Sequence, residues 1–409
     1  MMGISQPDVT FSEQAIPGQS NQIESAVPLF IGYTQQGAKF SAVRINSFSD
    51  FERLFGGAST TAAILYYAVK HYFDNGGSGG FVLSLGDYSA LESITAAQLL
   101  SAFGDARISE AVAIESTITL VAMPDTVLLE GAGAASSEWA KAWFALLTIC
   151  QVRQGVFGLF DPPDAAGSAS ACLASFMANH PANPEWGAAY WPHLVTTYGT
   201  DEQNPVVVPP SAALAAVIEY TDRESGVWKA PANAALAQVV KPSQSWLQSD
   251  GLFQPDGASL NLIRSFPGRG TRVWGCRTLT PNTSSPWLYV QTRRFIAFIE
   301  AELSRIGRQF VFETNNALTW IKYRGLAHLW LRQLWLDGGL QGSEEQEAFY
   351  IQIGLNETMT EEDVVNGKMI MKVGVAVGQP AEFIVISLAF DTRLSVMQAS
   401  VSAAGESAG

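Results

Sequence analysis

Residues 76–80 read Gly-Gly-Ser-Gly-Gly and match the pattern G-x-S-x-G. That pattern is typical of hydrolases, in which a strand, a sharp turn and a helix follow one another and expose the serine as a nucleophile. Here the order is reversed, because a helical pattern precedes the glycines and the apolar run 81–85 follows them. No Gly-Lys-Ser/Thr follows that would indicate a phosphate loop. The sequence therefore favours a helix-to-strand turn around Ser78 over a catalytic serine.

Side chains that bind metals are few and scattered. The 4 histidines and 3 cysteines stand singly along the chain: His71, His180, His193 and His328, and Cys150, Cys172 and Cys276. A metal site needs several ligands that converge, and a disulfide framework needs paired cysteines. The acidic residues Glu357, Glu361, Glu362 and Asp363 lack the spacing of a calcium loop and are more typical of a helix N-terminus. We therefore expect no metal, no cofactor and no disulfide framework.

One helical segment carries a basic stripe. Arg324, His328 and Arg332 are spaced four residues apart, which places them on one face of a helix. The other positions of residues 320–336 are apolar nearly all round, so this helix is either buried or held between partners. Two interpretations remain open: a partner-facing basic surface, or a core helix whose basic stripe meets water.

Composition limits the class of protein. A chain of 409 residues exceeds what one core usually covers, so two or more domains are expected. Charged residues are only 15% of the chain, which predicts apolar surfaces for partners. The longest apolar run, 142–152, is too short to cross a bilayer, and the N-terminus does not resemble a signal peptide. We expect a protein made in a reducing cytoplasm and not inserted in a membrane.

The formal charge of −14 is unevenly distributed. Residues 259–409 hold 14 basic and 14 acidic side chains, so residues 1–258 hold 10 of the 24 basic and 24 of the 38 acidic ones. An acidic body disfavours nucleic acid as a partner, and a neutral C-terminal part suits burial against other copies. Ordinary solubility charge would explain the acidity as well.

Strands and helices alternate over most of the chain, which predicts a mostly parallel α/β sheet. We expect strands at 29–33, 81–85, 118–123, 156–160 and 189–198, and helices at 60–72, 137–152, 168–180 and 212–220. The last third changes to an α+β pattern, with helices at 290–307 and 320–336 and strands at 348–355, 368–377 and 382–390.

Both ends are candidate arms. Residues 1–25 are polar and contain a short alternating stretch around Val9, Thr10, Phe11 and Ser12, with no hairpin partner nearby. Residues 391–409 are similar, because they alternate around Leu394 and Val396 and then end in small residues. A disordered tail is the alternative for each end.

Four segments carry a family resemblance. Their key residues are Pro209, Pro210 and Ser211; Gly226, Trp228, Pro231 and Asn233; Gly268, Arg269, Gly270, Trp274, Gly275 and Arg277; and Pro380, Ala381, Glu382 and Phe383. Together with 25–32, 72–77, 190–192 and 312–320, they resemble the sheath proteins of contractile phage tails, R-type bacteriocins and extracellular injection particles. The match extends in order over nearly the whole chain. It departs at Thr314, where the family usually has proline, and at the N-terminal arm, which reads Gln-Pro-Asp-Val in place of Pro-Gly-Val.

The resemblance implies a fold: a subtilisin-like α/β middle domain without the catalytic triad, an α+β C-terminal domain, and two extended arms. On this basis we predict an N-terminal arm at 1–25 and a strand-helix-strand segment at 26–90 that packs with the main body. The α/β domain is then expected at 91–265, the C-terminal domain at 266–388 and the C-terminal arm at 389–409. The predicted arm strands include Val9, Thr10, Phe11 and Ser12 at one end and Leu388, Phe390, Leu394 and Val396 at the other.

The resemblance also implies a function that is not enzymatic. Sheath subunits form stacked hexameric rings around an inner tube and shorten to drive the tube through a target envelope. The expected partners are other sheath subunits, the inner tube, and baseplate and cap proteins, in a particle assembled in the bacterial cytoplasm. Arms donated as strands to neighbouring copies would hold such a lattice together. We expect Arg324, His328 and Arg332 to face the tube. The alternatives are a non-contractile assembly protein and a serine hydrolase.

Overall fold

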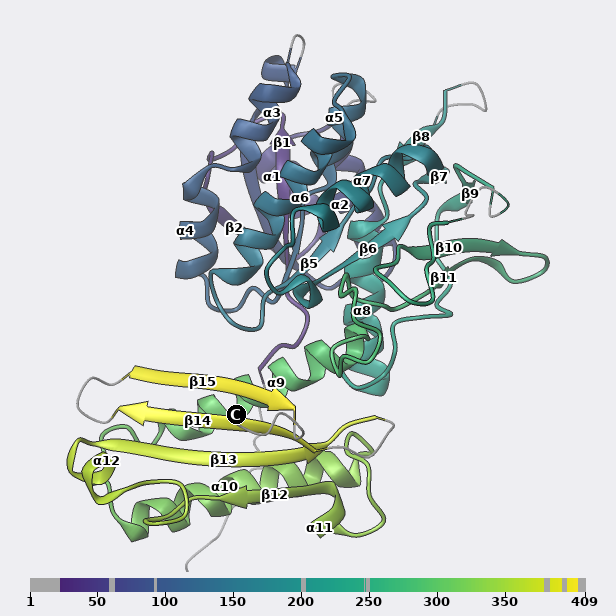
Figure 1. The fold of residues 1–409 in the computed structure, drawn as a ribbon. Helices are drawn as coiled ribbons and strands as arrows, with labels where there is room; N and C mark the ends of the chain where they lie inside the picture. Colours follow the sequence, from purple (N-terminus) through teal and green to yellow (C-terminus); the bar gives the residue numbers. More distant parts are fainter. Residues whose placement is uncertain are drawn as a thin grey trace, which may run out of the picture.

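The computed structural model describes residues 23–403 except 59–62, 92–93, 200–203, 246, 248–250, 379–382 and 392–395. Figure 1 shows an α/β body above and a smaller α+β domain below, joined through helix α9 and the chain segment that leads into β1.

One sheet of eight strands forms the centre of the body, in the order β11-β10-β6-β5-β4-β1-β3-β2. The six strands from β10 to β3 are parallel, and the antiparallel strands β2 and β11 close the two edges. Parallel strands buried on both faces require continuous apolar runs, and β1, β3, β4, β5 and β6 have them. The strands are β1 Pro28–Thr34, β2 Ala42–Ile45, β3 Gly80–Asp87, β4 Leu120–Ala122, β5 Phe157–Phe160, β6 Gly187–Trp191, β10 Asn261–Phe266 and β11 Gly270–Trp274.

Helices cover both faces of this sheet. One core lies beneath α3, α4, α6 and α7, and a second lies between the opposite face and α1, α2 and α8. The helices are α1 Phe48–Phe55, α2 Ile64–Asp74, α3 Ala96–Phe103, α4 Ala106–Ile114, α5 Leu128–Gly131, α6 Ser136–Gln151, α7 Ala166–Ala178 and α8 Ser211–Ser225, with 3₁₀ turns at Tyr88–Leu91, Pro124–Val127 and Pro184–Trp186. A small sheet of order β8-β7-β9 stands beside the body, built from β7 Leu194–Thr196, β8 Val206–Val208 and β9 Val239–Pro242.

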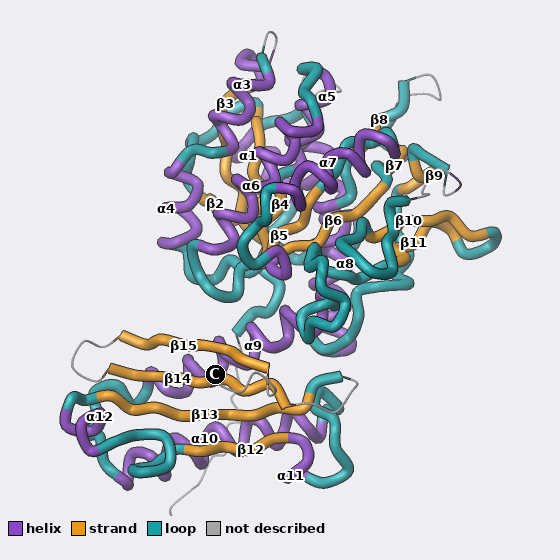
Figure 2. The backbone as a smooth tube through the Cα atoms, viewed as in Figure 1, coloured by secondary structure: helices purple, strands orange, loops and turns teal. Residues whose placement is uncertain are grey.

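The lower domain packs two long helices against an antiparallel sheet of order β12-β13-β14-β15 (Figure 2). Its elements are α9 Val290–Arg308, α10 Ala317–Leu336, α11 Glu345–Ala348, β12 Phe349–Gln352, α12 Glu361–Val365, β13 Lys368–Ala376, β14 Phe383–Asp391 and β15 Val396–Ala403. Gly307 lets the sheet approach α9 closely, because a Cβ at that position would lie 2.0 Å from the ring of Phe390.

The structure confirms the predicted plan of a mostly parallel α/β sheet followed by an α+β domain. Among single elements, the strand expected at 189–198 is two strands, β6 and β7, because the chain turns at Pro192. Helices α3 and α4 and the hairpin β10–β11 were not predicted.

Two predicted domain boundaries are wrong. The boundary at 265/266 cuts through β10, which continues the sheet of the body. The boundary at 388/389 cuts through β14. Leu388 and Phe390 therefore do not belong to an arm: both are fully buried in the core of their own domain, where the Phe390 ring lies 5.4 Å from that of Tyr323.

Candidate functional site

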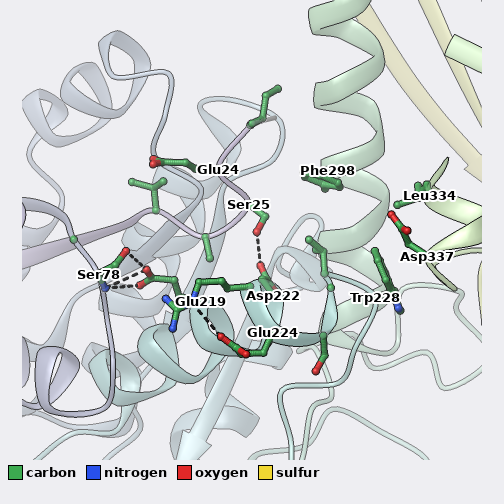
Figure 3. Close-up of a pocket in the computed structure, with 18 of the residues that line it drawn as sticks. Glu24, Ser25, Ser78, Glu219, Asp222, Glu224, Trp228, Phe298, Leu334 and Asp337 are labelled. Atoms are coloured by element: carbon green, nitrogen blue, oxygen red, sulfur yellow. Dashed lines mark hydrogen bonds and ion pairs between the residues drawn. The ribbon is translucent and has the colours of Figure 1, made fainter. Parts of the chain in front are cut away.

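Ser78 lies in the turn between α2 and β3, as the order of elements predicted. Its hydroxyl and its backbone N–H both bind the carboxylate of Glu219 on α8, the N–H at 3.1 Å (Figure 3). The hydroxyl of Tyr72 binds the same carboxylate. Ser78 therefore fastens a glycine-rich turn to helix α8.

An Asp, a His and a Ser do lie near one another at the carboxyl end of β5. Asp161 accepts a hydrogen bond from the backbone N–H of Ser211 at 3.0 Å, and His193 Nε2 lies 2.9 Å from the carbonyl of Pro162. All three side chains are buried, and burial raises the pKa of Asp161 to about 7. Asp161 thus caps the first turn of α8, which begins after the buried Pro209 and Pro210. This network holds α8 against the sheet and is closed to solvent.

Within the described part of the chain, no three His, Cys, Asp or Glu side chains are grouped so that they could hold a metal ion. In the same residues, no helix is both long enough and apolar enough to cross a membrane.

The joint between the body and the C-terminal domain is held by a buried ion pair. Arg294 on α9 donates to Asp222 on α8 through Nη1 at 3.0 Å and Nη2 at 2.7 Å. Both side chains are 5% exposed. Such a bidentate pair fixes the orientation of the two helices because both hydrogen bonds must be satisfied together.

The segment that precedes β1 joins the same pair. Ser25 donates its hydroxyl to Asp222 at 2.6 Å (Figure 3). Its backbone carbonyl accepts a hydrogen bond from Arg294 at 2.9 Å. The backbone N–H of Ile23 binds Glu302, also on α9. Ser25, Asp222 and Arg294, here called the joint triad, therefore connect the segment that precedes β1, the body and the C-terminal domain.

Two cavities flank the joint triad. One, of about 770 Å³, is shown in Figure 3 and is bordered by Glu24, Glu224, Trp228 and Asp337. The other, of about 630 Å³, lies along α9. Glu300 lines it, and burial raises the pKa of this carboxyl to about 7. Open space therefore lies on both sides of the joint triad.

The motif residues that follow α8 complete the joint. Gly226 ends the helix with φ +92, and a Cβ there would lie 2.4 Å from the Trp228 ring. The ring can therefore fold back and pack 5.6 Å from that of Phe295 on α9. The buried Pro231 follows. The motif thus positions an aromatic anchor between the two bodies.

The glycine-arginine motif forms the tip of the hairpin β10–β11. Gly268 and Gly270 both have φ +70, which only glycine adopts readily. Asn233 pairs with the outer edge of β11, donating its N–H to Val273 at 2.7 Å. At the base, Asn261 accepts from the N–H of Arg277 at 2.7 Å and leaves no room for a Cβ at Gly275. Trp274, the last residue of β11, is 43% exposed.

The basic stripe on α10 is neutralised within its own domain. Arg324 donates to Glu357 at 3.0 Å, and Glu345 binds both His328 at 2.7 Å and Arg332 at 3.0 Å. Beside the basic stripe, α10 exposes several apolar side chains. They are Leu318, Ile321, Leu326, Leu329 and Leu336, with exposures from 41% to 66%, and Phe312 just before the helix is 90% exposed. We call these six residues the apolar stripe.

The C-terminal sheet ends in an edge strand. β15 pairs with β14 over eight residues, from Val396 opposite Asp391 to Ala403 opposite Ile384. Phe383 is the first residue of β14. The remaining arm and motif predictions lie outside the described residues: Val9, Thr10, Phe11, Ser12, Pro380, Ala381, Glu382 and Leu394.

Solved structures match this chain over more than nine tenths of its length, and a family model matches part of it. Residues 282–391 match the family model of the phage tail sheath C-terminal domain. A chain of the anti-feeding prophage baseplate in the contracted state is 37% identical, with 92% of this chain and 96% of that chain covered and a TM-score of 0.78. The comparison with curated protein sequences gave no match.

Two sheath structures are also similar. The anti-feeding prophage helical sheath in the contracted state is 30% identical, covering 93% of this chain and 98% of that one at a TM-score of 0.67. The PVC sheath complex of an extracellular contractile injection system, also contracted, is 29% identical, covering 93% and 96% at 0.66. With 30% identity to a helical sheath chain and 37% to a baseplate chain over more than nine tenths of its length, the chain belongs to the contractile tail sheath family.

Proposed function

We propose that this sheath subunit polymerises into stacked hexameric rings around an inner tube and shortens without nucleotide hydrolysis. The observation that supports this most is the likeness to contracted sheath chains over more than nine tenths of this chain. A heterologous contact repeated with a rotation and a rise generates such a cylinder. The extended lattice would be a kinetic trap, and the contracted lattice would bury more interface.

Exchange of β15 is the proposed link between subunits. An edge strand joined to its sheet by a short connection can pair with the same edge in a neighbouring copy. The eight residue pairs formed with a neighbour's β14 would be the same as those within one chain, so the exchange costs little free energy. The N-terminal arm, including Val9 and Phe11, would add a further strand to another subunit.

A cysteine pair tests the exchange. Ser387 on β14 lies directly opposite Ser400 on β15, and neither is buried, so Ser387→Cys with Ser400→Cys should form a disulfide. Cys276, which is partly exposed, is replaced by Ser in this background because the other two cysteines are buried. We expect a bond within one chain in monomers and a ladder of linked chains in assembled sheaths. Purely intrachain bonds in assembled sheaths would rule out the exchange.

The outward surface of α10 is the proposed tube contact. The apolar stripe would supply most of the binding free energy, because its side chains are exposed in the isolated subunit. Arg324, His328 and Arg332 border it, and their ion pairs with glutamates leave them less free to act as the main contact.

The remaining roles follow from the same proposal. The body would keep a subtilisin-like arrangement of a parallel sheet between helix layers, with no catalytic activity. Terminal rings would bind baseplate and cap proteins, and assembly would take place in the bacterial cytoplasm.

A further inference from the structure

The hairpin β10–β11 projects from the body (Figure 1). On one side of its two strands Asn261, Ile263, Thr271 and Val273 are buried. On the other side Leu262 packs against the core of the body, and the positions farther out form what is here called the hairpin face: Arg264, Phe266, Arg272 and Trp274, together with Arg269 at the tip. The rings of Phe266 and Trp274 lie 4.7 Å apart on it.

Two arginines on the hairpin face, Arg269 and Arg272, are held by uncharged groups of the subunit. Arg272 stands directly opposite Arg264 across the two strands. In the described chain, Arg272 donates to the carbonyls of Arg269 and Asn233, and Arg269 donates to the side-chain amide of Asn233. These acceptors are neutral, so they fix the two guanidinium groups in place without cancelling their charge.

The sequence around the hairpin is basic. Residues 257–292 contain four arginines and no Asp or Glu. The first 258 residues, in contrast, hold 24 acidic and 10 basic side chains. Each subunit therefore carries a basic hairpin beside an acidic body, and arginine with tryptophan and phenylalanine is the composition of interface hot spots.

We infer that the hairpin face is a contact between subunits, and that its partner is the acidic α/β body of a second copy of this chain. Charge complementarity selects that partner, because the chain as a whole carries −14 and its acidic excess lies in the body. The fixed guanidinium groups would form charge-assisted hydrogen bonds with carboxylates, and Phe266 and Trp274 would be covered. The inference rests on the proposed polymerisation for the source of the second copy.

Reversal of charge tests the contact. Arg269→Glu with Arg272→Glu should weaken self-association, followed by sedimentation velocity at low salt, at least tenfold. The matched control, Lys141→Glu with Lys229→Glu, reverses two exposed lysines and should stay within about twofold of the wild type. Circular dichroism confirms that each variant is folded. Equal association of the hairpin variant and the wild type, or equal loss in the control, would overturn the inference.

A coupling experiment identifies the partner. In Arg269→Lys the introduced amine keeps the charge and can be coupled to a neighbouring carboxylate by a carbodiimide. With mixed ¹⁴N- and ¹⁵N-labelled subunits, we expect links between chains from position 269 to Asp or Glu residues of the acidic body. Links only within one chain, only to the tube, or none at all would contradict the inferred contact between the hairpin face and the body of a second copy. If regular tubes form without such links, the hairpin contact is refuted and the proposed sheath function stands. If the links form but no regular tubes do, the sheath function is refuted and the hairpin contact stands.

Discussion

Replacing Arg294 with alanine is expected to destabilise the protein by about 3–5 kcal/mol, because it leaves the Asp222 carboxylate buried without a counter-ion. The loss includes the hydrogen bond from Arg294 to the carbonyl of Ser25. Urea unfolding of the full chain measures this change in the free energy of unfolding.

Arg223→Ala is the matched control, since Arg223 is on the same helix and pairs with Glu224 at 3.5 Å with both side chains about half exposed. An exposed pair of this kind contributes at most about 1 kcal/mol. The double change Arg294→Met with Asp222→Leu should recover much of the stability, because it removes both charges. If Arg294→Ala unfolds at the same urea concentration as Arg223→Ala, the joint triad does not hold the two bodies together.

Placing carboxylates in the apolar stripe is expected to prevent the sheath from enclosing a tube. Ile321 and Leu329 are 66% and 64% exposed and lie about two turns apart along α10. Burying each against a partner contributes roughly 1.5–3 kcal/mol, so Ile321→Glu with Leu329→Glu should weaken each tube contact more than about a hundredfold. Co-purification of tube protein with the sheath variant measures the effect.

Arg324→Gln with Arg332→Gln is the control on the same helix. It removes two exposed ion pairs and should keep most tube binding, at a cost in stability of about 1 kcal/mol or less per pair. Normal tube content in the Ile321/Leu329 variant would show that α10 does not face the tube. Loss of the tube only in the arginine variant would restore the basic stripe as the contact.

Much of the fold could be predicted from local patterns. The apolar runs of β3 and β5 and the helical periodicity of α6, α9 and α10 are strong enough to identify these elements without tertiary information. The hairpin β10–β11 was missed because its strands alternate and carry arginines on the outward face. A strand around Val396 was predicted from the alternation of its sequence, but its pairing with β14 of the same chain is long-range and could not be predicted.

The joint triad could not be predicted, because its members are separated by 72 to 269 positions along the chain. The motif around Asp222 and Trp228 was visible, but nothing local indicates that it meets Arg294. In the same way, the basic stripe on α10 looked free because the glutamates that neutralise it, Glu345 and Glu357, come from later segments. Contacts between residues far apart in the sequence form the joint triad and neutralise the basic stripe, and the periodicity of a sequence carries no information about such contacts.

The central claim is that terminal strands connect copies of this chain into a cylinder that changes from a metastable extended length to a stable contracted one. Cryo-electron microscopy of the purified protein assembled with its tube tests it, with a variant lacking residues 1–20 as the control. We expect two helical lattices of different pitch and diameter for the full chain, and folded monomers for the variant. A single lattice under all conditions, or regular tubes from the shortened chain, would contradict the account.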